Sequence, residues 1–181
     1  MTLEIGQTIP AFSVASTGEL AEVSSESLAG KTYVLYFYPK DATPGCTLEG
    51  QQFRELYAQF QALNCEIFGV SRDTLKLHEK FRANECFPSQ LLGDSDEALC
   101  RLFDVIKTKN MYGKQVQGIE RSTFLVDGQG QLRQAWRKVK ADGHAAEVLQ
   151  AVQALGKTRF TRQNCVMPAE SVVCDFSSCP A

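Results

Sequence analysis

Tyr33-Val-Leu-Tyr-Phe-Tyr-Pro39-Lys-Asp-Ala-Thr43-Pro-Gly-Cys46-Thr-Leu-Glu49 is the stretch that decides how this chain folds. Its apolar and aromatic first part predicts a buried strand over Tyr33–Tyr38 that stops at Pro39. A Pro/Gly turn follows, and a helix then begins at Cys46, because apolar residues recur at helical spacing at Phe53, Leu56, Phe60 and Leu63. The free N–H groups of that helix and the positive end of its dipole would point at the Cys46 sulfur, which favours a reactive thiolate. The alternative is a small buried cysteine in a helix-start turn, without chemistry.

Strand and helix patterns alternate along the rest of the chain. Further strands are predicted as a hairpin around Thr17-Gly18, formed by residues 11–15 and the segment near Val23, and at Cys65–Ser71, Leu91-Leu92, Ser122–Val126 and Leu132–Trp136. Further helices are predicted from a cap at Asp73 or Thr74 towards Asn84, from a cap at Asp94 or Ser95 over Leu99, Leu102 and Phe103, and along the apolar stripe Ala145, Val148, Leu149, Val152 and Leu155. This alternation, with one late hairpin around Asp127–Gly130, predicts an α/β sandwich.

Composition excludes several classes of function. A chain of 181 residues is enough for one domain with a proper core and is short for two. The formal net charge of -2 gives no nucleic-acid footprint, and the short cluster Arg137-Lys138-x-Lys140 is expected to be a solvated strand end. The N-terminus lacks the basic and apolar regions of a signal peptide, and no apolar run is long enough to span a bilayer. We therefore expect a cytoplasmic protein that binds neither nucleic acid nor membrane.

The seven cysteines do not form a recognisable disulfide scaffold. Their number is odd, their spacing is irregular, and no pair has the C-x-x-C spacing of a thioredoxin-type dithiol or a zinc ribbon. His78 and His144 lie far from any cysteine pair and are predicted to be surface residues of helices. Redox chemistry of thiols therefore explains the count better than structural bridges do, and no metal or cofactor is expected.

The sequence resembles one known family in two separated motifs. Pro39-x-x-x-Thr43-x-x-Cys46 followed by Glu49 resembles the peroxidatic-cysteine motif of the peroxiredoxins, and its longer wording from Tyr36 to Thr47 looks like the bacterioferritin-comigratory, or peroxiredoxin Q, branch. Gly118–Asp127 is similar to the second active-site segment of the family, in which an arginine opens a strand. Ala135–Lys140 with Gly143-His144 resembles the late strand and final helix of that branch.

The resemblance covers residues 3 to about 155 and implies the fold. It implies a thioredoxin-like domain over residues 1–155, with a central mixed β-sheet flanked by helices and an N-terminal β-hairpin. Residues 156–181 fall outside it as a tail that begins basic and polar and then carries Cys165, Cys174 and Cys179. Flexibility with incidental cysteines is the expectation for this tail, although its thiols could also reach an oxidised site, bridge to another chain or bind a metal loosely.

The resemblance also assigns roles around Cys46. It implies that Arg121 lies beside the sulfur, favours the thiolate and stabilises charge that develops on a peroxide. It implies that Glu49, one helical turn after Cys46, orients this arginine. Taken alone, Glu49 is an ordinary first-turn acid and Arg121 is a surface strand end.

The residues just before Cys46 add the remaining parts of the predicted site. The Thr43 hydroxyl can turn back toward the sulfur and toward a bound substrate. The backbone N–H groups of Gly45 and Cys46 can hold a peroxide oxygen, whereas Pro44 has no N–H to offer. Pro39 would cover the thiolate and keep it partly dry.

A second thiol must capture the sulfenic acid that forms on Cys46. Many members of the branch carry this resolving cysteine five residues after the peroxidatic one, where this chain has Gln51. Other members carry it on the next helix, and Cys86 is then the candidate. Cys65 and Cys100 are predicted to be buried packing residues. An external thiol, or the cysteines of the tail, remain alternatives to Cys86.

The resemblance implies a thiol peroxidase that reduces hydrogen peroxide and organic hydroperoxides and is recycled by thioredoxin. A monomer is the expectation for its assembly. The residues by themselves support only the reactive thiol. Two other functions stay open at this point. One is a binding or chaperone protein of the same fold with marginal peroxidase turnover, and the other is a metal-binding tail.

Overall fold

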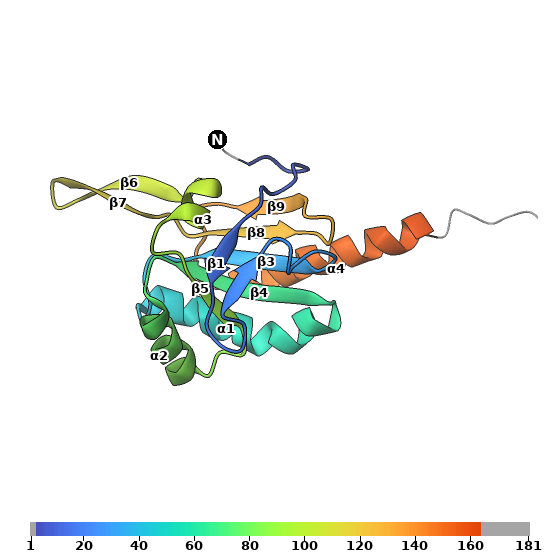
Figure 1. The fold of residues 1–181 in the computed structure, drawn as a ribbon, viewed down its shortest axis with the longest axis horizontal. Helices are drawn as coiled ribbons and strands as arrows, with labels where there is room; N and C mark the ends of the chain where they lie inside the picture. The colour runs from blue at the N-terminus through green and yellow to red at the C-terminus, as the bar shows by residue number, and fades with distance from the viewer. Residues whose placement is uncertain (1–2, 164–181) are drawn as a thin grey trace, which may run out of the picture.

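The computed structural model describes residues 3–163, which form a central mixed sheet with helices packed around it (Figure 1). The sheet has the strand order β5-β4-β3-β8-β9. Its strands are β3 (Thr32–Phe37), β4 (Cys65–Ser71), β5 (Gln90–Gly93), β8 (Ser122–Val126) and β9 (Leu132–Trp136). The central strand β3 runs parallel to β4 and antiparallel to β8, and all six of its residues are buried. The predicted thioredoxin-like α/β fold is therefore confirmed, as is a central strand that is buried on both faces.

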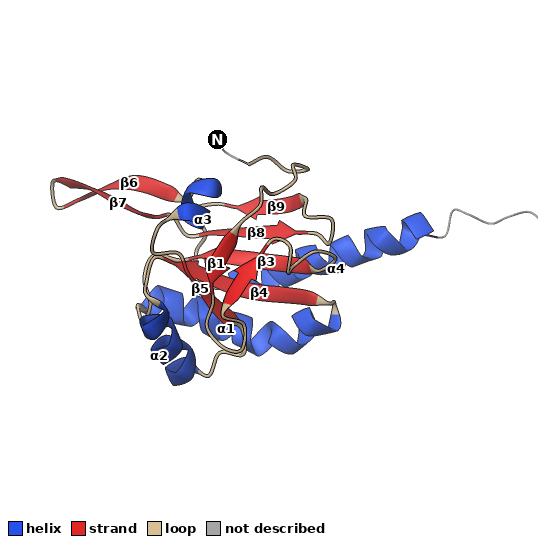
Figure 2. Cartoon of the chain, viewed as in Figure 1, coloured by secondary structure: helices blue, strands red, loops and turns tan. Residues whose placement is uncertain are grey.

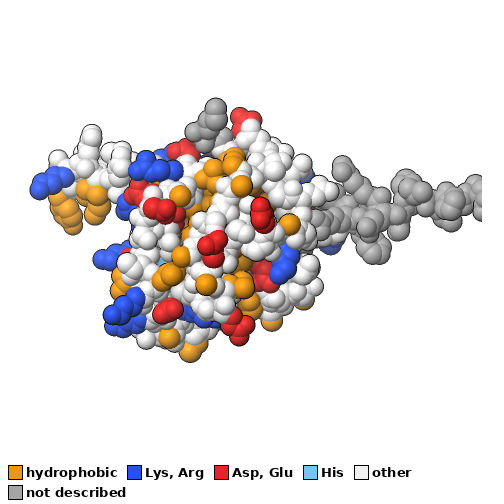
Figure 3. Space-filling view, viewed as in Figure 1, with side chains coloured by type: hydrophobic (Ala, Val, Ile, Leu, Met, Phe, Trp, Pro, Cys, Tyr) orange, Lys and Arg blue, Asp and Glu red, His pale blue; other side chains and the backbone are white. Residues whose placement is uncertain are grey.

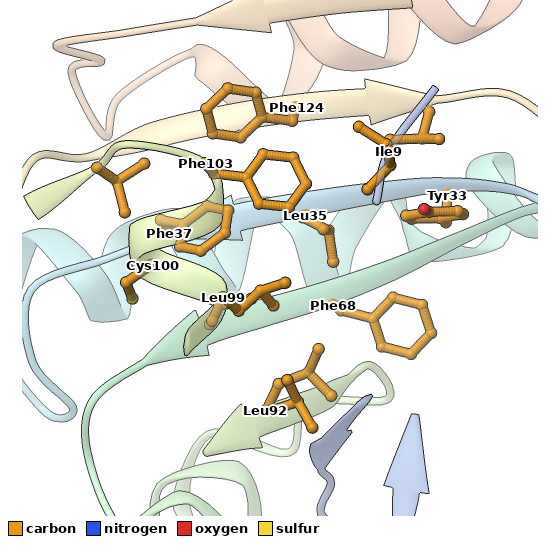
Figure 4. Packing of buried hydrophobic residues seen from close by; sticks show 14 of the residues in the cluster. Ile9, Tyr33, Leu35, Phe37, Phe68, Leu92, Leu99, Cys100, Phe103 and Phe124 are labelled. Atoms are coloured by element: carbon orange, nitrogen blue, oxygen red, sulfur yellow. The ribbon is translucent and has the colours of Figure 1, made fainter. Parts of the chain in front are cut away.

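Two apolar clusters fill the two faces of this sheet. Figure 2 shows the blue helices around the red strands that carry them. On one face, side chains of β3 and β4 pack against helices α1 (Pro44–Ala62), α2 (Leu75–Glu85) and α4 (His144–Gln163). On the other face, Leu35, Phe37 and Phe124 pack against Leu99, Cys100 and Phe103 in and after the short helix α3 (Ala98–Leu102), as Figure 4 shows. Successive side chains along a strand point to opposite faces of the sheet, so each strand contributes residues to both clusters.

Two hairpins lie outside the central sheet. The predicted N-terminal hairpin is present, with β1 (Ser13–Ala15) paired to β2 (Glu22–Ser24). The second hairpin, β6 (Ile106–Met111) with β7 (Lys114–Ile119), was missed from the sequence and projects from the body (Figure 1). Most of its residues are exposed, so its strands lack the alternation of apolar and polar residues by which a strand is predicted from sequence. Figure 3 shows basic and hydrophobic side chains side by side on it. The turn Tyr112-Gly113, with positive φ at both residues, is the signal that could have found it.

The prediction that both histidines are surface residues is wrong. His78 is fully buried and His144 is 3% exposed. Each imidazole is buried because it has polar partners: His78 contacts Asp41 and the Leu92 carbonyl, and His144 contacts the Thr123 hydroxyl. His78 also shares the buried face of α2 with Phe81, three residues further on.

Several element ends differ from the predicted ones. Helix α1 begins at Pro44, with Thr43 at its N-cap, so Cys46 is the third helical residue and not the first. Helix α4 continues past Leu155 to Gln163. The Asp94 carboxylate accepts the N–H groups of Leu99 and Cys100, and it thus caps α3 from a position four residues before its start.

The cysteines separate into buried and exposed groups. Cys46, Cys65 and Cys100 are buried, Cys86 is exposed, and all four are free thiols. Burial raises the pKa of Cys65 to about 12, and burial followed by the neighbouring Asp94 raises that of Cys100 well above its ordinary range. The prediction that these two cysteines serve packing agrees with that. The cysteines of the predicted tail, 165, 174 and 179, lie outside the described residues.

Replacement of a helical glycine by alanine should change the free energy of unfolding in opposite directions at two positions. A Cβ on buried Gly50 of α1 would lie 2.4 Å from the ring of Phe87, whereas one on Gly156 of α4 would meet nothing within 4 Å. Gly50→Ala should therefore lower the free energy of unfolding by about 1–3 kcal/mol through overpacking. Gly156→Ala should raise it by about 0.5–1 kcal/mol through helix propensity. Urea unfolding of both variants checks this, and equal effects at the two sites would contradict the packing argument.

Candidate active site

Cys46 lies in the first turn of α1, the helix that follows the central strand β3. Strand β3 ends at Phe37, the loop 38–43 follows, and α1 begins at Pro44. The side chain is 2% exposed. The hydrogen bond from Thr47 N–H to the Thr43 carbonyl, 2.9 Å, starts the helical ladder. The N–H groups of Gly45 and Cys46 precede it and have no acceptor within the helix, so the sulfur lies at the electropositive end of α1.

Arg121 joins Cys46 to Glu49. Its Nη2 donates to the Cys46 sulfur at 3.2 Å, and its Nη1 donates to Glu49 Oε2. Arg121 directly precedes β8, and its carbonyl accepts the Val139 N–H at 3.0 Å, which fixes the backbone from which the side chain reaches across. The three residues that the resemblance brought together are thus in direct contact, although 75 positions separate Arg121 from Cys46.

Glu49 is an unusual residue to find in this place, because its side chain is fully buried. Burial raises its pKa and the Arg121 guanidinium lowers it, with a net pKa of about 7. Arg121 is more exposed; burial lowers its pKa, but Glu49 and Cys46 raise it further, so it stays charged. Glu49 Oε1 has no hydrogen-bond partner among the described residues. A buried carboxylate with one unpaired oxygen is costly, so its contact with Arg121 is the interaction that keeps it there.

Thr43 and Gly45 shape the space around the sulfur. The Thr43 hydroxyl donates to the Lys40 carbonyl at 3.0 Å and not to the sulfur, which leaves its lone pairs free to accept a hydrogen bond. A Cβ on Gly45 would lie 3.2 Å from Arg121 Nη2. Gly45 therefore lets the guanidinium approach the helix start, a role that was not predicted. Pro39 is exposed and lies between the end of β3 and the helix.

The segment that carries Cys86 packs against the helix that carries Cys46. Cys86 ends α2 in a left-handed conformation and is exposed. The next residue, Phe87, is buried against Gly50 of α1. Two polar contacts accompany this packing: Gln51 Nε2 donates to Glu85 Oε2 at 2.8 Å, and Arg54 Nη1 donates to the Glu85 carbonyl at 2.6 Å.

Sequence reasoning missed a buried polar network beside this site. It consists of Tyr38, Asp41 and His78. The signal for Asp41 is its place in the loop between the strand and Cys46, and the signal for His78 is its spacing of three from Phe81.

Between residues 3 and 163, no helix has the length and apolar character needed to cross a membrane. In the same part of the chain, no three histidine, cysteine or acidic side chains converge as a metal site requires.

Comparisons with known proteins agree with this geometry. The model of the AhpC/TSA family matches residues 5–135. Peroxiredoxin Bcp of Xanthomonas campestris is 59% identical over 129 residues, which cover 71% of this chain and 81% of the relative. Peroxiredoxin Bcp of Bacillus subtilis is 45% identical over 158 residues, or 87% of this chain and 99% of the relative.

A solved structure extends the likeness to three dimensions. The bacterioferritin comigratory protein of Xanthomonas campestris, described in connection with its alkyl peroxide reduction activity, superposes with a TM-score of 0.77 at 52% identity. It covers 80% of this chain and 92% of its own. With the Cys46–Arg121–Glu49 contact in place and relatives of this similarity, the chain belongs to the AhpC/TSA family and is a peroxiredoxin of the bacterioferritin-comigratory, or peroxiredoxin Q, branch.

Proposed function

We propose that this peroxiredoxin reduces hydrogen peroxide and organic hydroperoxides with Cys46 as the attacking thiolate. The observation that carries the proposal is the contact of one guanidinium with both the Cys46 sulfur and the buried Glu49. A cation held at that position favours the thiolate and faces the charge that forms as the peroxide bond breaks. The alkyl peroxide reduction activity attached to the similar Xanthomonas protein supports organic hydroperoxides as substrates.

The site residues divide the first step among them. The Cys46 thiolate attacks one peroxide oxygen; an S–O bond forms, the O–O bond breaks, and the departing oxygen leaves as an alkoxide or hydroxide that takes up a proton. The Thr43 oxygen accepts a hydrogen bond from the peroxide O–H, because its own proton is engaged with the Lys40 carbonyl. Arg121 and the N–H groups of Gly45 and Cys46 stabilise the oxygens as charge develops. Pro39 shields the loop side of the site.

Cys86 then resolves the sulfenic acid. Its thiol attacks the Cys46 sulfur, a disulfide forms, and water leaves. Gln51, at the position of the alternative resolving cysteine, closes the same-helix route and hydrogen-bonds to Glu85 beside Cys86. Because a disulfide needs Cα atoms roughly 4.4–6.8 Å apart, the first turn of α1 and the end of α2 are expected to unwind locally. A thioredoxin-type dithiol reduces the bridge in turn.

The remaining parts of the proposal concern the whole protein. Residues 1–155 act as one peroxiredoxin domain, and residues 156–181 are not needed for the chemistry. The protein works as a cytoplasmic monomer without a cofactor. Stoichiometric consumption of peroxide with a thioredoxin system separates this function from a binding or chaperone role with marginal turnover, and zinc content with and without the tail tests a metal-binding tail.

Arg121→Ala should slow the reaction of Cys46 with peroxide by about tenfold or more, since a charge-stabilising donor is removed from the transition state. Stopped-flow mixing of reduced protein with peroxide measures this step. Cys46→Ser should abolish it with the fold intact. Arg101→Ala, which removes an arginine paired to Glu97 on the exposed side of α3, is the matched control and should react like the wild type. A wild-type rate for Arg121→Ala would remove this arginine from the site.

Glu49 should make the folded protein less stable as pH rises. Its pKa is about 7 in the fold against an ordinary value of 4.5. Between these two values the folded protein holds more protons than the unfolded chain, so the contribution is fully present below about 4.5 and is lost towards 7. Urea unfolding across this range should show a decline that Glu49→Gln flattens by a few kcal/mol. Glu55→Gln, at an exposed position of the same helix, should retain the decline. Identical pH profiles for all three proteins would refute the assignment.

Cys86→Ser should consume one equivalent of peroxide and then fail to turn over with thioredoxin, because Cys46 remains as sulfenic or sulfinic acid. Intact mass and a coupled turnover assay follow the two events. Removal of residues 164–181, which leaves α4 whole, should have no effect on turnover. If Cys86→Ser cycles normally and the truncated protein does not, the tail cysteines resolve Cys46. If both cycle, an external thiol does.

A further inference from the structure

The loop that leads to Cys46 is held by a buried polar network and not by packing alone. Asp41, in the middle of loop 38–43, accepts the Tyr38 hydroxyl on Oδ1 at 2.7 Å and meets His78 Nδ1 on Oδ2 at 2.7 Å. Its backbone N–H donates to Asp73 Oδ2 at 2.7 Å, and the Ser71 hydroxyl at the end of β4 donates to the same oxygen at 2.9 Å. Both the side chain and the main chain of Asp41 are therefore tied to the β4–α2 region.

The partner of Asp41 is a histidine with both ring nitrogens engaged. His78 is fully buried in α2, and its Nε2 lies 3.1 Å from the Leu92 carbonyl oxygen. A carbonyl only accepts, so Nε2 carries a hydrogen, and Nδ1 lies within hydrogen-bond distance of the Asp41 carboxylate. Burial, Tyr36 and Asp41 raise the pKa of Tyr38 well above its usual range, so its hydroxyl stays a donor. All polar ends of this network thus have a complementary partner, which a buried ion pair requires.

A cavity of about 190 Å³ lies between the loop and the outer part of α2, and it is lined by Lys40, Asp41, Ala42, Asp73, Leu77, Lys80, Phe81 and Asn84. Ala42 has a positive φ of 57°, a conformation that an alanine adopts only when its surroundings impose it. A strained loop beside a cavity needs a specific anchor, and Asp41 supplies it.

We propose that the Asp41–His78 pair is a positioning clamp for the peroxide reaction. It fixes the loop that ends at Thr43 and leads into the start of α1, where Cys46 meets Arg121. It acts through these residues without touching the substrate. The proposal rests on the function proposed for Cys46. On α2 the clamp is held by His78, in the first half of the helix and two turns before Cys86, and it lies outside the two helix ends that the Cys46–Cys86 bridge unwinds. It therefore anchors the loop while those ends open and close.

Four single substitutions test the clamp. Asp41→Asn and His78→Gln should each slow the stopped-flow reaction of the reduced protein with peroxide by about tenfold or more, because a displacement of about 1 Å at a reacting group costs that much. Tyr38→Phe, which removes one hydrogen bond from Asp41 and keeps the volume, should slow it by about two- to fivefold. Asp94→Asn is the control, since Asp94 is also a buried carboxylate but caps α3 on the other face of the sheet.

The rate is compared with the melting temperature of each variant, at an assay temperature well below all of them. Asp94→Asn should lower the melting temperature and leave the rate unchanged. If Asp41→Asn and His78→Gln behave in the same way, the pair is merely structural and the proposal fails. If neither of them folds, Tyr38→Phe decides, and a wild-type rate for it also overturns the clamp. Failure of the proposed function is distinguished by a separate measurement. If Cys46→Ser reacts with peroxide as fast as the wild type, the function itself is wrong, whatever the clamp variants do.

Discussion

The site depends on a single guanidinium that is shared between a thiol and a buried carboxylate. Arg121 has to stay charged and close to Cys46, and Glu49 has to be buried to hold it there. Burial alone would drive Glu49 to the neutral acid, and Arg121 opposes this, so each partner makes the position of the other possible. Gly45 belongs to the same constraint, because any side chain there would crowd the arginine. The start of α1, with Gly45 and Cys46, and Arg121 just before β8 therefore depend on one another.

Sheet register brings these parts together. In the antiparallel pairing of β3 with β8, Phe37 lies opposite Ser122. The last residue of the strand that leads to Cys46 is therefore beside the first residue of the strand that follows Arg121. Both strands are buried on both faces, and their side chains pack into two different apolar clusters. A slip of one residue would exchange the side chains between these clusters, so their packing holds the register that brings Arg121 to Cys46.

What the sequence could predict follows from how far each feature is encoded locally. The strand, turn and helix around Cys46 are contiguous, so their pattern placed the thiol at a helix start. Arg121 is 75 residues away, and only the resemblance to a family joined it to Cys46. The two histidines were assigned to the surface because burial of an imidazole depends on partners such as Asp41 and Thr123, which no local pattern reveals. The hydrogen bond from the Thr43 hydroxyl to the Lys40 carbonyl was not predicted either, because it depends on the shape of the loop.

The same interactions that build the reduced site also limit the cost of opening it. In the reduced fold Glu49 is desolvated and one of its oxygens has no partner among the described residues. Unwinding of α1 from Pro44 as far as Glu49 would return this carboxylate to water, which offsets part of the hydrogen bonding and packing that is lost. Two contacts oppose this opening: the packing of Phe87 against Gly50 and the hydrogen bond from Arg54 to the Glu85 carbonyl. Both act at the end of α2, where Cys86 lies. The buried Glu49 carboxylate is costly in the closed site, and only a few contacts at the end of α2 hold that site closed. The site can therefore stay ordered while it reacts with peroxide and still open locally once the sulfur is oxidised.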